Sequence, residues 1–357
     1  MALTEDQLFA ISVTERVCSA ISLTSACAAM STYLICKKCR KPIINRLIFY
    51  ALLGNIVLDV ATLIARSAIP QGTQSSLCQI QAFLIQWFFP ADAIWALCIA
   101  WNVYLIVLRG YDYDQLRQLE WIYVPICYLL PFIPAFTFLF IETAERGKVY
   151  GPAVIECWIS TTWDILRIAA LYGPVWFFIV LIFVIYIRVG LLIYSRFKQL
   201  LQVSSNHSGI EGPHQIESFS TTDRYEMTVA VSLQCEESRL QRQETAVGSF
   251  TLTTTRDSMH SNLDTAAYAY LRYAFLFFIA LLVTWVPSSA NRLSTLINPD
   301  YVSFGLQYTA SFVIPLQGFW NSLIFFNISR RECKALFIHT RDDIALKVKR
   351  LFDNSVE

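Results

Sequence analysis

Apolar residues gather into seven long runs along the chain, each long enough to cross a lipid bilayer as a helix. A spanning helix needs about 20 mostly apolar residues, because its backbone hydrogen bonds must be made internally in the hydrocarbon. The runs are Val13 to Cys36, Leu47 to Ile69, Ile80 to Leu108, Trp121 to Ile141, Ile165 to Tyr194, Ala269 to Ala290 and Val302 to Phe326. The pattern predicts an all-α membrane protein built as a seven-transmembrane helix bundle.

Composition supports a membrane protein over a soluble one. Only 15% of the 357 residues are charged and 55% are hydrophobic, whereas soluble domains carry about 25% charged residues. The net charge is +1, without the basic face that nucleic-acid binding needs. We therefore expect membrane lipid around the chain and no nucleic acid as a partner.

Basic residues predict the orientation of the bundle. The first connection holds Lys37, Lys38, Arg40 and Lys41, and loops rich in Lys and Arg stay in the cytosol. The N-terminus is then outside and the C-terminus cytosolic. The predicted segments are an extracellular N-terminus (1–12), spans one to five (13–194), a long disordered third inner loop (195–266), spans six and seven (267–328), and a cytosolic interfacial helix and tail (329–357). Within the inner loop, the patch from Tyr225 to Ala246 is equally compatible with a helix and with disorder.

Two cysteines fall on the predicted outer side. Cys78 opens the third span and Cys157 lies in the loop before the fifth. An oxidising compartment favours a disulfide between them, and closing so long a loop would stabilise the protein. Two free thiols are the alternative.

Two carboxylates lie inside predicted spans, where charge is costly and usually faces the bundle interior. At 1.5 Å per residue, Asp59 is about 15 Å inward from Ile69 and Asp92 about 20 Å inward from Cys78. We hypothesise that they share a polar cavity near Asn55 and form an intramembrane polar pair. Two separate, protonated side chains that only specify packing are the alternative.

Other polar residues and prolines in the spans allow two interpretations each. Arg66 and Arg292, near outer helix ends, are expected to reach lipid head groups, whereas Arg167 can point into the bundle and bind an anionic ligand. Prolines interrupt helical hydrogen bonding, so they predict either hinges or static bends. These prolines are Pro174, Pro287 and Pro315.

Sequence signatures of catalysis are absent. The four histidines all lie in predicted cytosolic segments, and no motif for hydrolysis or phosphate binding is present. The Cys36 to Cys39 spacing has no second ligand pair to complete a metal site. We expect neither an enzyme nor a cofactor nor a bound metal; Cys333, beside a basic helix, is a candidate for palmitoylation.

Several stretches resemble one family of receptors. They are Asn45-Arg46-Leu47-Ile48, Ala91-Asp92-Ala93-Ile94-Trp95, Asn102-Val103-Tyr104-Leu105, Cys157-Trp158, Tyr172-Gly173-Pro174-Val175-Trp176 and Pro315-Leu316-Gln317-Gly318-Phe319-Trp320-Asn321. Together with the topology, they make the chain similar to the slime-mould cyclic-AMP receptors and their fungal relatives, and more distantly to secretin-type receptors. These families are G-protein-coupled receptors.

The resemblance implies a plasma-membrane receptor that activates a heterotrimeric G protein. It also implies phosphorylation by a receptor kinase and binding of arrestin-like proteins. Candidate ligand-binding residues are Arg66, Trp95, Arg167, Trp285 and Gln307. Candidate hinge or switch residues are Pro174, Pro287, Pro315, Gln317 and Gly318, and candidate G-protein contacts are Arg188, Arg196, Lys198, Arg272 and Arg330.

Two departures limit the resemblance. Span three ends Leu108-Arg109-Gly110-Tyr111-Asp112, unlike the Asp/Glu-Arg-Tyr switch of rhodopsin-like receptors. The outer N-terminus is too short for a hormone-binding domain, so we expect a small ligand. The resemblance suggests cyclic AMP, while a sugar, an amino acid or a lipid fits the residues equally well. The alternatives to a receptor are a proton- or ion-coupled transporter using Asp59 and Asp92, and a scaffold of receptor shape.

Overall fold

The computed structural model describes residues 3–207, 254–297, 302–338 and 341, without the side chains of 196–207 and 254–269. Within this part of the chain, seven helical segments are long and apolar enough to cross a membrane. They are Glu5–Ile35, Ile43–Gln71, Ser76–Arg109, Tyr113–Phe138, Thr161–Ser195, Tyr270–Ile297 and Phe304–Ile328. The seven predicted spans are confirmed, with ends that move by up to eight residues.

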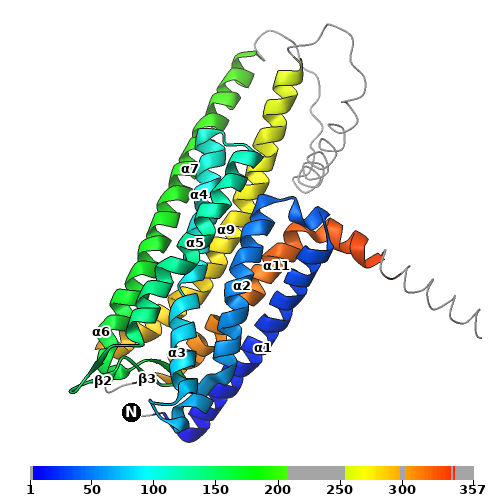
Figure 1. The fold of residues 1–357 in the computed structure, drawn as a ribbon. Helices are drawn as coiled ribbons and strands as arrows, with labels where there is room; N and C mark the ends of the chain where they lie inside the picture. The colour runs from blue at the N-terminus through cyan, green and yellow to red at the C-terminus, as the bar shows by residue number, and fades with distance from the viewer. Residues whose placement is uncertain (1–2, 208–253, 298–301, 339–340, 342–357) are drawn as a thin grey trace, which may run out of the picture. The chain divides into compact units, whose positions relative to one another are not determined.

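The chain divides into two compact units. The first comprises Met1–Ile99, Asp112–Ile182 and Leu276–Glu357, and the second Ala100–Tyr111 and Phe183–Phe275. The helices of the first unit are α1 (Glu5–Ile35), α2 (Ile43–Ile64), α3 (Ser76–Phe88), α5 (Tyr113–Phe138), α6 (Asp164–Arg167), α10 (Phe304–Val313) and α11 (Gln317–Ile328). In this unit α1 packs against α2, α10 and α11, and α3 packs against α2 and α5 (Figure 1).

Three helices run from one unit into the other. They are α4 (Ala91–Arg109), α7 (Gly173–His207) and α9 (Thr254–Ile297). Both α7 and α9 extend into the stretch that we predicted as a disordered loop. The reason is that residues 196–207 contain no proline or glycine, so a helix already formed in the membrane continues at little cost. The patch from Tyr225 to Ala246 lies outside the described residues.

Prolines interrupt two of the spans. Pro90 separates α3 from α4, because a proline has no N–H to continue the helix. This break was not predicted from the sequence. Pro315 lies in the short 3-10 turn η5 (Ile314–Leu316) between α10 and α11. Pro287 stays inside the continuous α9, and Pro174 is the second residue of α7. Whether these three prolines act as hinges stays a prediction.

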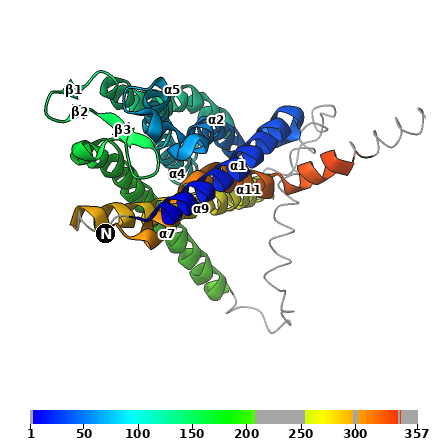
Figure 2. The same cartoon turned by 90° about the horizontal axis from the view of Figure 1, so that it is seen from below.

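Two small hairpins connect α5 to the fifth span (Figure 2). In the first, β1 (Glu142–Thr143) pairs with β2 (Gly147–Lys148); in the second, β3 (Tyr150–Pro152) pairs with β4 (Cys157–Ile159). The chain then passes through η3 (Thr161–Trp163), α6 and the π-helical turn η4 (Ile168–Tyr172) before α7. These hairpins and the loop after α2, named η2 (Ala65–Gln71), form what we call the disulfide end of the first unit.

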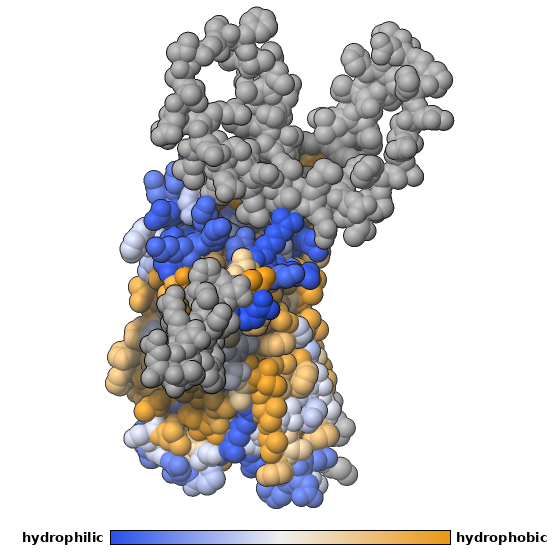
Figure 3. Space-filling model, turned by 90° about the vertical axis from the view of Figure 1, so that its right-hand side faces the viewer, coloured by the Kyte–Doolittle hydropathy of each residue, from blue (hydrophilic) through white to orange (hydrophobic). Residues whose placement is uncertain are grey.

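The helix after the seventh span is confirmed, since residues 330–338 are helical. Large apolar side chains are exposed along the spans, among them Trp121 (86%) and Ile133 (62%). On the face drawn in Figure 3, hydrophobic residues (orange) cover a broad area, and hydrophilic residues (blue) gather at its two ends. This is the surface of a protein whose solvent is lipid.

Candidate functional site

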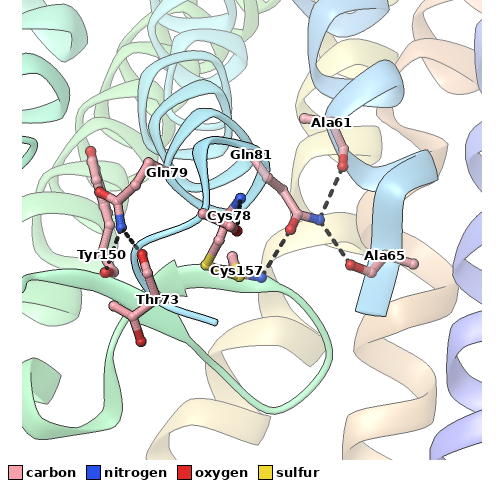
Figure 4. Close-up of a disulfide and its surroundings, with 9 residues drawn as sticks. Ala61, Ala65, Thr73, Cys78, Gln79, Gln81, Tyr150 and Cys157 are labelled. Atoms are coloured by element: carbon pink, nitrogen blue, oxygen red, sulfur yellow. Dashed lines mark hydrogen bonds between the residues drawn. A yellow bond between two sulfur atoms is a disulfide. The ribbon is translucent and has the colours of Figure 1, made fainter. Parts of the chain in front are cut away.

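A disulfide bond joins Cys78 of α3 to Cys157 of β4, with their Cα atoms 5.2 Å apart (Figure 4). Gln81, one turn after Cys78, fixes the surroundings of the bond. Its Oε1 accepts a hydrogen bond from the backbone N–H of Cys157 (3.1 Å), and its Nε2 donates to the carbonyl oxygens of Ala61 (3.2 Å) and Ala65 (3.0 Å). One side chain thus connects α2, α3 and β4.

The β3–β4 hairpin is fastened at a second point. Gln79 Nε2 donates to the carbonyl oxygens of Thr73 (2.7 Å) and Tyr150 (3.1 Å). Buried Tyr150 donates its hydroxyl to the carbonyl oxygen of Ala135 in α5 (2.8 Å). Burial raises the pKa of Tyr150 above its usual value, so this hydroxyl remains a donor. The hairpin is therefore a fixed part of the first unit.

Arg167, predicted to bind an anionic ligand, is buried and bonded to its own chain. Its Nε donates to the carbonyl oxygen of Ile159 (2.8 Å), and one terminal nitrogen donates to the same oxygen. The other terminal nitrogen lies 3.2 Å from Asp164 Oδ1, and the guanidinium stacks over the Trp158 ring. Each donor nitrogen of Arg167 thus has a partner, so its geometry is that of a support for the β4 strand.

Arg292 of α9 is the arginine with a donor to spare. Its side chain is 13% exposed and pairs with Asp164 at 2.7 Å, which contradicts the expectation that it reaches lipid head groups. Its Nε is buried and has no hydrogen-bond partner within the described residues. Two arginines share the single carboxylate of Asp164, so this cluster carries a net positive charge.

Aromatic rings continue the site inward from these charges. Trp285 of α9 stacks on Phe89 (centroids 4.5 Å apart) and meets the edge of Tyr172 (6.1 Å). The Tyr172 hydroxyl is 3.1 Å from Ser288 Oγ. Trp158 donates to Gln86 Oε1 (2.9 Å), which ties β4 to α3.

A groove of about 460 Å³ opens beside this cluster, between the start of the fifth span and α9. It is lined by Ile168, Tyr172, Trp176, Val286, Ser289, Ala290, Arg292, Leu293 and Leu296. Gln307 of α10 lies next to it in the hydrogen-bond network, because it accepts from Asn291 Nδ2 (2.7 Å). The groove has apolar walls and one cationic group, a combination suited to a small amphipathic or anionic molecule.

The other two predicted ligand residues lie elsewhere. Arg66 is half-buried in η2. Trp95 is 1% exposed and stacks on Tyr50, with the ring centroids 5.8 Å apart. Tyr50 lies in the first half of α2, away from the end of α2 that leads into η2. Of the five candidates, the structure brings together Arg167, Trp285 and Gln307.

Asp59 and Asp92 lie in one buried polar cluster. Asp92 Oδ1 accepts hydrogen bonds from Asn321 Nδ2 (2.8 Å) and Asn55 Nδ2 (3.3 Å). Asp59 interacts with Ser22, and its Oδ2 has no hydrogen-bond partner in the described chain. The Asp59 side chain is buried, and so is that of Gln317, a predicted switch residue. The cluster links α1, α2, α4 and α11. That Asp59 and Asp92 act together as a functional pair stays a prediction.

The fold and this site can be compared with known proteins. A family model described as 7 transmembrane receptor (Secretin family) matches residues 8–238, which is more than half of the chain. The chain belongs to this family of G-protein-coupled receptors. The receptor also resembles squid rhodopsin in a crystal structure, with a TM-score of 0.59 and 11% sequence identity over 95% of this chain and 88% of that one. This second similarity shows the seven-helix fold alone.

No curated protein sequence matches the receptor. Its family comprises receptors rather than enzymes. Within the described residues, no group of three His, Cys, Asp or Glu side chains is placed to hold a metal ion.

Gly318 gives the receptor a close contact between α11 and its neighbours. A Cβ at this position would lie 2.8 Å from Ser22 Oγ, 3.1 Å from Asn55 Cβ and 3.3 Å from Asp59 Oδ2. We expect Gly318→Ala to destabilise the receptor by about 1–3 kcal/mol through overpacking. Gly305→Ala in α10 is the control, because its Cβ would meet nothing within 4 Å, and it should stabilise by about 0.5–1 kcal/mol. Thermal unfolding in detergent measures both, and equal effects would contradict the tight contact.

The predicted G-protein contacts are only partly described. Arg188, Arg272 and Arg330 are exposed, and the side chains of Arg196 and Lys198 lie outside the described part. The structure also shows an ion pair that sequence reasoning missed. Two donor nitrogens of Arg46 in α2, Nε and Nη2, each lie 2.7 Å from an oxygen of the Glu120 carboxylate in α5. Neither residue stands out in sequence, because each lies at the edge of an apolar run.

Cys333 lies against the first connection of the receptor. Its thiol interacts with that of buried Cys39, beside Asn45, which donates to Ser329 Oγ (2.7 Å). Burial raises the pKa of both thiols above the usual value, so both are mostly protonated near neutral pH. Palmitoylation of Cys333 stays a prediction, since a thiol must leave this contact to react.

Proposed function

We propose that this receptor binds a small extracellular ligand at its disulfide end and activates a heterotrimeric G protein at the opposite face of the plasma membrane. The observation that carries the proposal is the Arg292 side chain, which borders a groove and whose Nε has no hydrogen-bond partner among the residues that the structure describes. Membership of a receptor family supports signalling over ion transport. The basic first connection, with Lys37 and Lys38, supports a cytosolic position for the other end.

The charge of the groove supports an anionic ligand. The Arg292 Nε–H can donate one charge-assisted hydrogen bond to a carboxylate or a phosphate, since its terminal nitrogens donate to Asp164 and Thr295. Trp176 and Tyr172 can pack against an apolar or aromatic body. Cyclic AMP, which the cyclic-AMP-receptor resemblance suggests, has both features. A ligand of this kind shifts the receptor only by its higher affinity for the active arrangement.

Guanine-nucleotide exchange tests coupling. The receptor in lipid nanodiscs is mixed with a panel of purified heterotrimeric G proteins, alone and with cyclic AMP or its uncharged nucleoside, adenosine. We expect one heterotrimer to exchange nucleotide faster with the receptor than without it. The double variant Arg196→Ala, Arg272→Ala should slow this exchange by up to about 30-fold, because two ion pairs at a protein surface together contribute up to roughly 2 kcal/mol.

The control is Arg146→Ala, which removes an exposed arginine at the disulfide end. Arg292→Gln should abolish any response to an anionic ligand while leaving the basal rate unchanged. Failure of every heterotrimer to respond, with and without ligand, contradicts the proposal.

A further inference from the structure

A second groove lies at the other end of the span that contains Cys78. It encloses about 470 Å³ and is lined by Trp101, Tyr104, Leu105, Arg109 and Tyr111. These residues belong to the end of α4 and the turn that follows it, and all of them lie in the second unit. One short stretch of the chain thus builds a groove that is separate from the proposed ligand groove.

The wall of this groove is aromatic. The rings of Trp101 and Tyr104 stack with their centroids 4.9 Å apart and their planes at 12°, although Trp101 is 43% exposed. Each helical residue turns the chain by about 100°, so Ile99 and Val103 point roughly opposite to Trp101, and both are buried. The aromatic stack therefore lies on the side of a membrane-spanning helix that is turned away from its buried residues, where acyl chains surround it.

A reversal of the chain closes the end of the groove. Gly110 adopts a left-handed conformation (φ 66°), which a glycine reaches without a Cβ clash. Its N–H donates to the carbonyl oxygen of Ile106 (3.2 Å), and the N–H of Tyr111 donates to that of Leu105 (3.2 Å). The turn thereby holds Tyr111 against the last part of α4, where it lines the same space as Arg109.

Arg109 adds a positive charge that no described neighbour takes up. It is exposed and makes no hydrogen bond or ion pair with any residue that the structure describes. Asp112, the nearest carboxylate along the chain, accepts a hydrogen bond from the Gln115 N–H (2.9 Å) as the N-cap of α5. The groove therefore offers a cation with open donors.

The apolar wall and the charge follow each other along the membrane normal. Arg109 is the last residue of its span, and Trp101 lies about 12 Å further into the hydrocarbon at 1.5 Å per residue. An acyl chain and a phosphate occur in this order in a phospholipid. A protein from the aqueous side would have to enter the hydrocarbon to reach Trp101, whereas a lipid is already there.

We propose that this groove binds one anionic phospholipid, with an acyl chain along Trp101 and Tyr104 and the phosphate on Arg109. The guanidinium can fork to two phosphate oxygens, and the Tyr111 hydroxyl can donate a further hydrogen bond. A net negative head group is favoured over a zwitterionic one, because the choline of the latter brings a second cation next to Arg109. Anionic lipids are concentrated in the cytoplasmic leaflet. That this end faces the cytosol rests on the proposed function; the lipid site itself does not.

Native mass spectrometry of the full receptor in detergent tests the site. The receptor is titrated with phosphatidylserine and, separately, with phosphatidylcholine of the same acyl chains. We expect the first phosphatidylserine to bind about tenfold more tightly, the effect of one charge-assisted contact. Arg109→Gln should lower the affinity for phosphatidylserine about tenfold and leave that for phosphatidylcholine unchanged, and Arg109→Lys should stay within about threefold of the wild type. Trp101→Ala should weaken the binding of both lipids about tenfold, because it removes the apolar wall.

The matched controls are Arg117→Gln and Trp121→Ala in α5, which remove an exposed arginine and an exposed tryptophan outside the groove. Both should bind the two lipids as the wild type does. Thermal unfolding in detergent checks the fold of every variant, and we expect each to unfold close to the wild-type temperature, since the substituted side chains are exposed.

Two results would overturn the proposal. One is equal affinity of the wild type for the two lipids, or a preference for phosphatidylserine that survives in folded Arg109→Gln. The other is unchanged lipid binding by Trp101→Ala together with loss of its coupling to a G protein, because the groove would then hold a protein partner. Since the titration contains no G protein, its result stands whichever way the nucleotide-exchange experiment turns out.

Discussion

Arg46→Met should destabilise the receptor by about 3–5 kcal/mol, because it leaves the Glu120 carboxylate without its cation. The Glu120 side chain is 5% exposed, whereas that of Arg46 is 20% exposed. Glu120→Gln should therefore cost less, since the arginine that it leaves unpaired is closer to solvent. The bidentate geometry, with two contacts of 2.7 Å, makes this pair stronger than a single-point ion pair.

A double-mutant cycle separates the pair from its surroundings. Arg46→Met combined with Glu120→Leu removes both charges, and we expect it to recover most of the stability lost by Arg46→Met alone. Thermal unfolding in nanodiscs at one pH gives the four values of the cycle. Simple additivity of the two single effects would show that the groups do not interact energetically.

Cys157→Ser should cost about 2–5 kcal/mol, the usual effect of removing a native disulfide. The bond closes a loop between positions 79 residues apart, so its loss frees a long part of the unfolded chain. Loss of the disulfide also releases β4, whose Cys157 is hydrogen-bonded to Gln81 and whose Ile159 is hydrogen-bonded to Arg167. We therefore expect ligand-dependent nucleotide exchange to be lost together with stability.

The matched control for this variant is Cys27→Ser, which removes an exposed free thiol from α1. It should unfold at the wild-type temperature. A reducing agent should lower the unfolding temperature of the wild type to that of Cys157→Ser and leave the variant unchanged. An unaltered wild type under full reduction would show that the bond contributes nothing to stability.

The seven spans could be predicted because the bilayer imposes a length on every helix that crosses it. Breaks within the spans were harder to place. Pro315 interrupts its span and Pro287 does not, although both residues lie in apolar runs. A proline leaves a carbonyl oxygen of the preceding turn without its N–H donor. Whether the helix breaks depends on which neighbouring groups can donate a hydrogen bond to that oxygen, and a single sequence does not contain that information.

The candidate site was predictable only where one residue type restricts the chemistry. Cys78 and Cys157 could be paired because both faced the same compartment. Arg167 could be predicted to point inward, but the group that it binds could not. That group is the backbone carbonyl of Ile159, in a hairpin that no hydrophobic pattern indicates. The Arg46–Glu120 ion pair was missed for a related reason: the two residues are far apart in sequence, and each alone lies at the edge of an apolar run.

The π-helical turn η4 has a consequence for residue register in the fifth span. The turn accommodates one residue more than an α-helix would, and Gly173 allows it, since a Cβ there would lie 2.9 Å from the Ile168 carbonyl oxygen. Each α-helical residue turns the chain by about 100°. A helical wheel drawn backward from α7 therefore places Arg167 about 100° from its actual direction, facing away from Ile159. Relatives that lack this extra residue would present a different side chain to the β4 strand, even where the letters of the two sequences agree on either side.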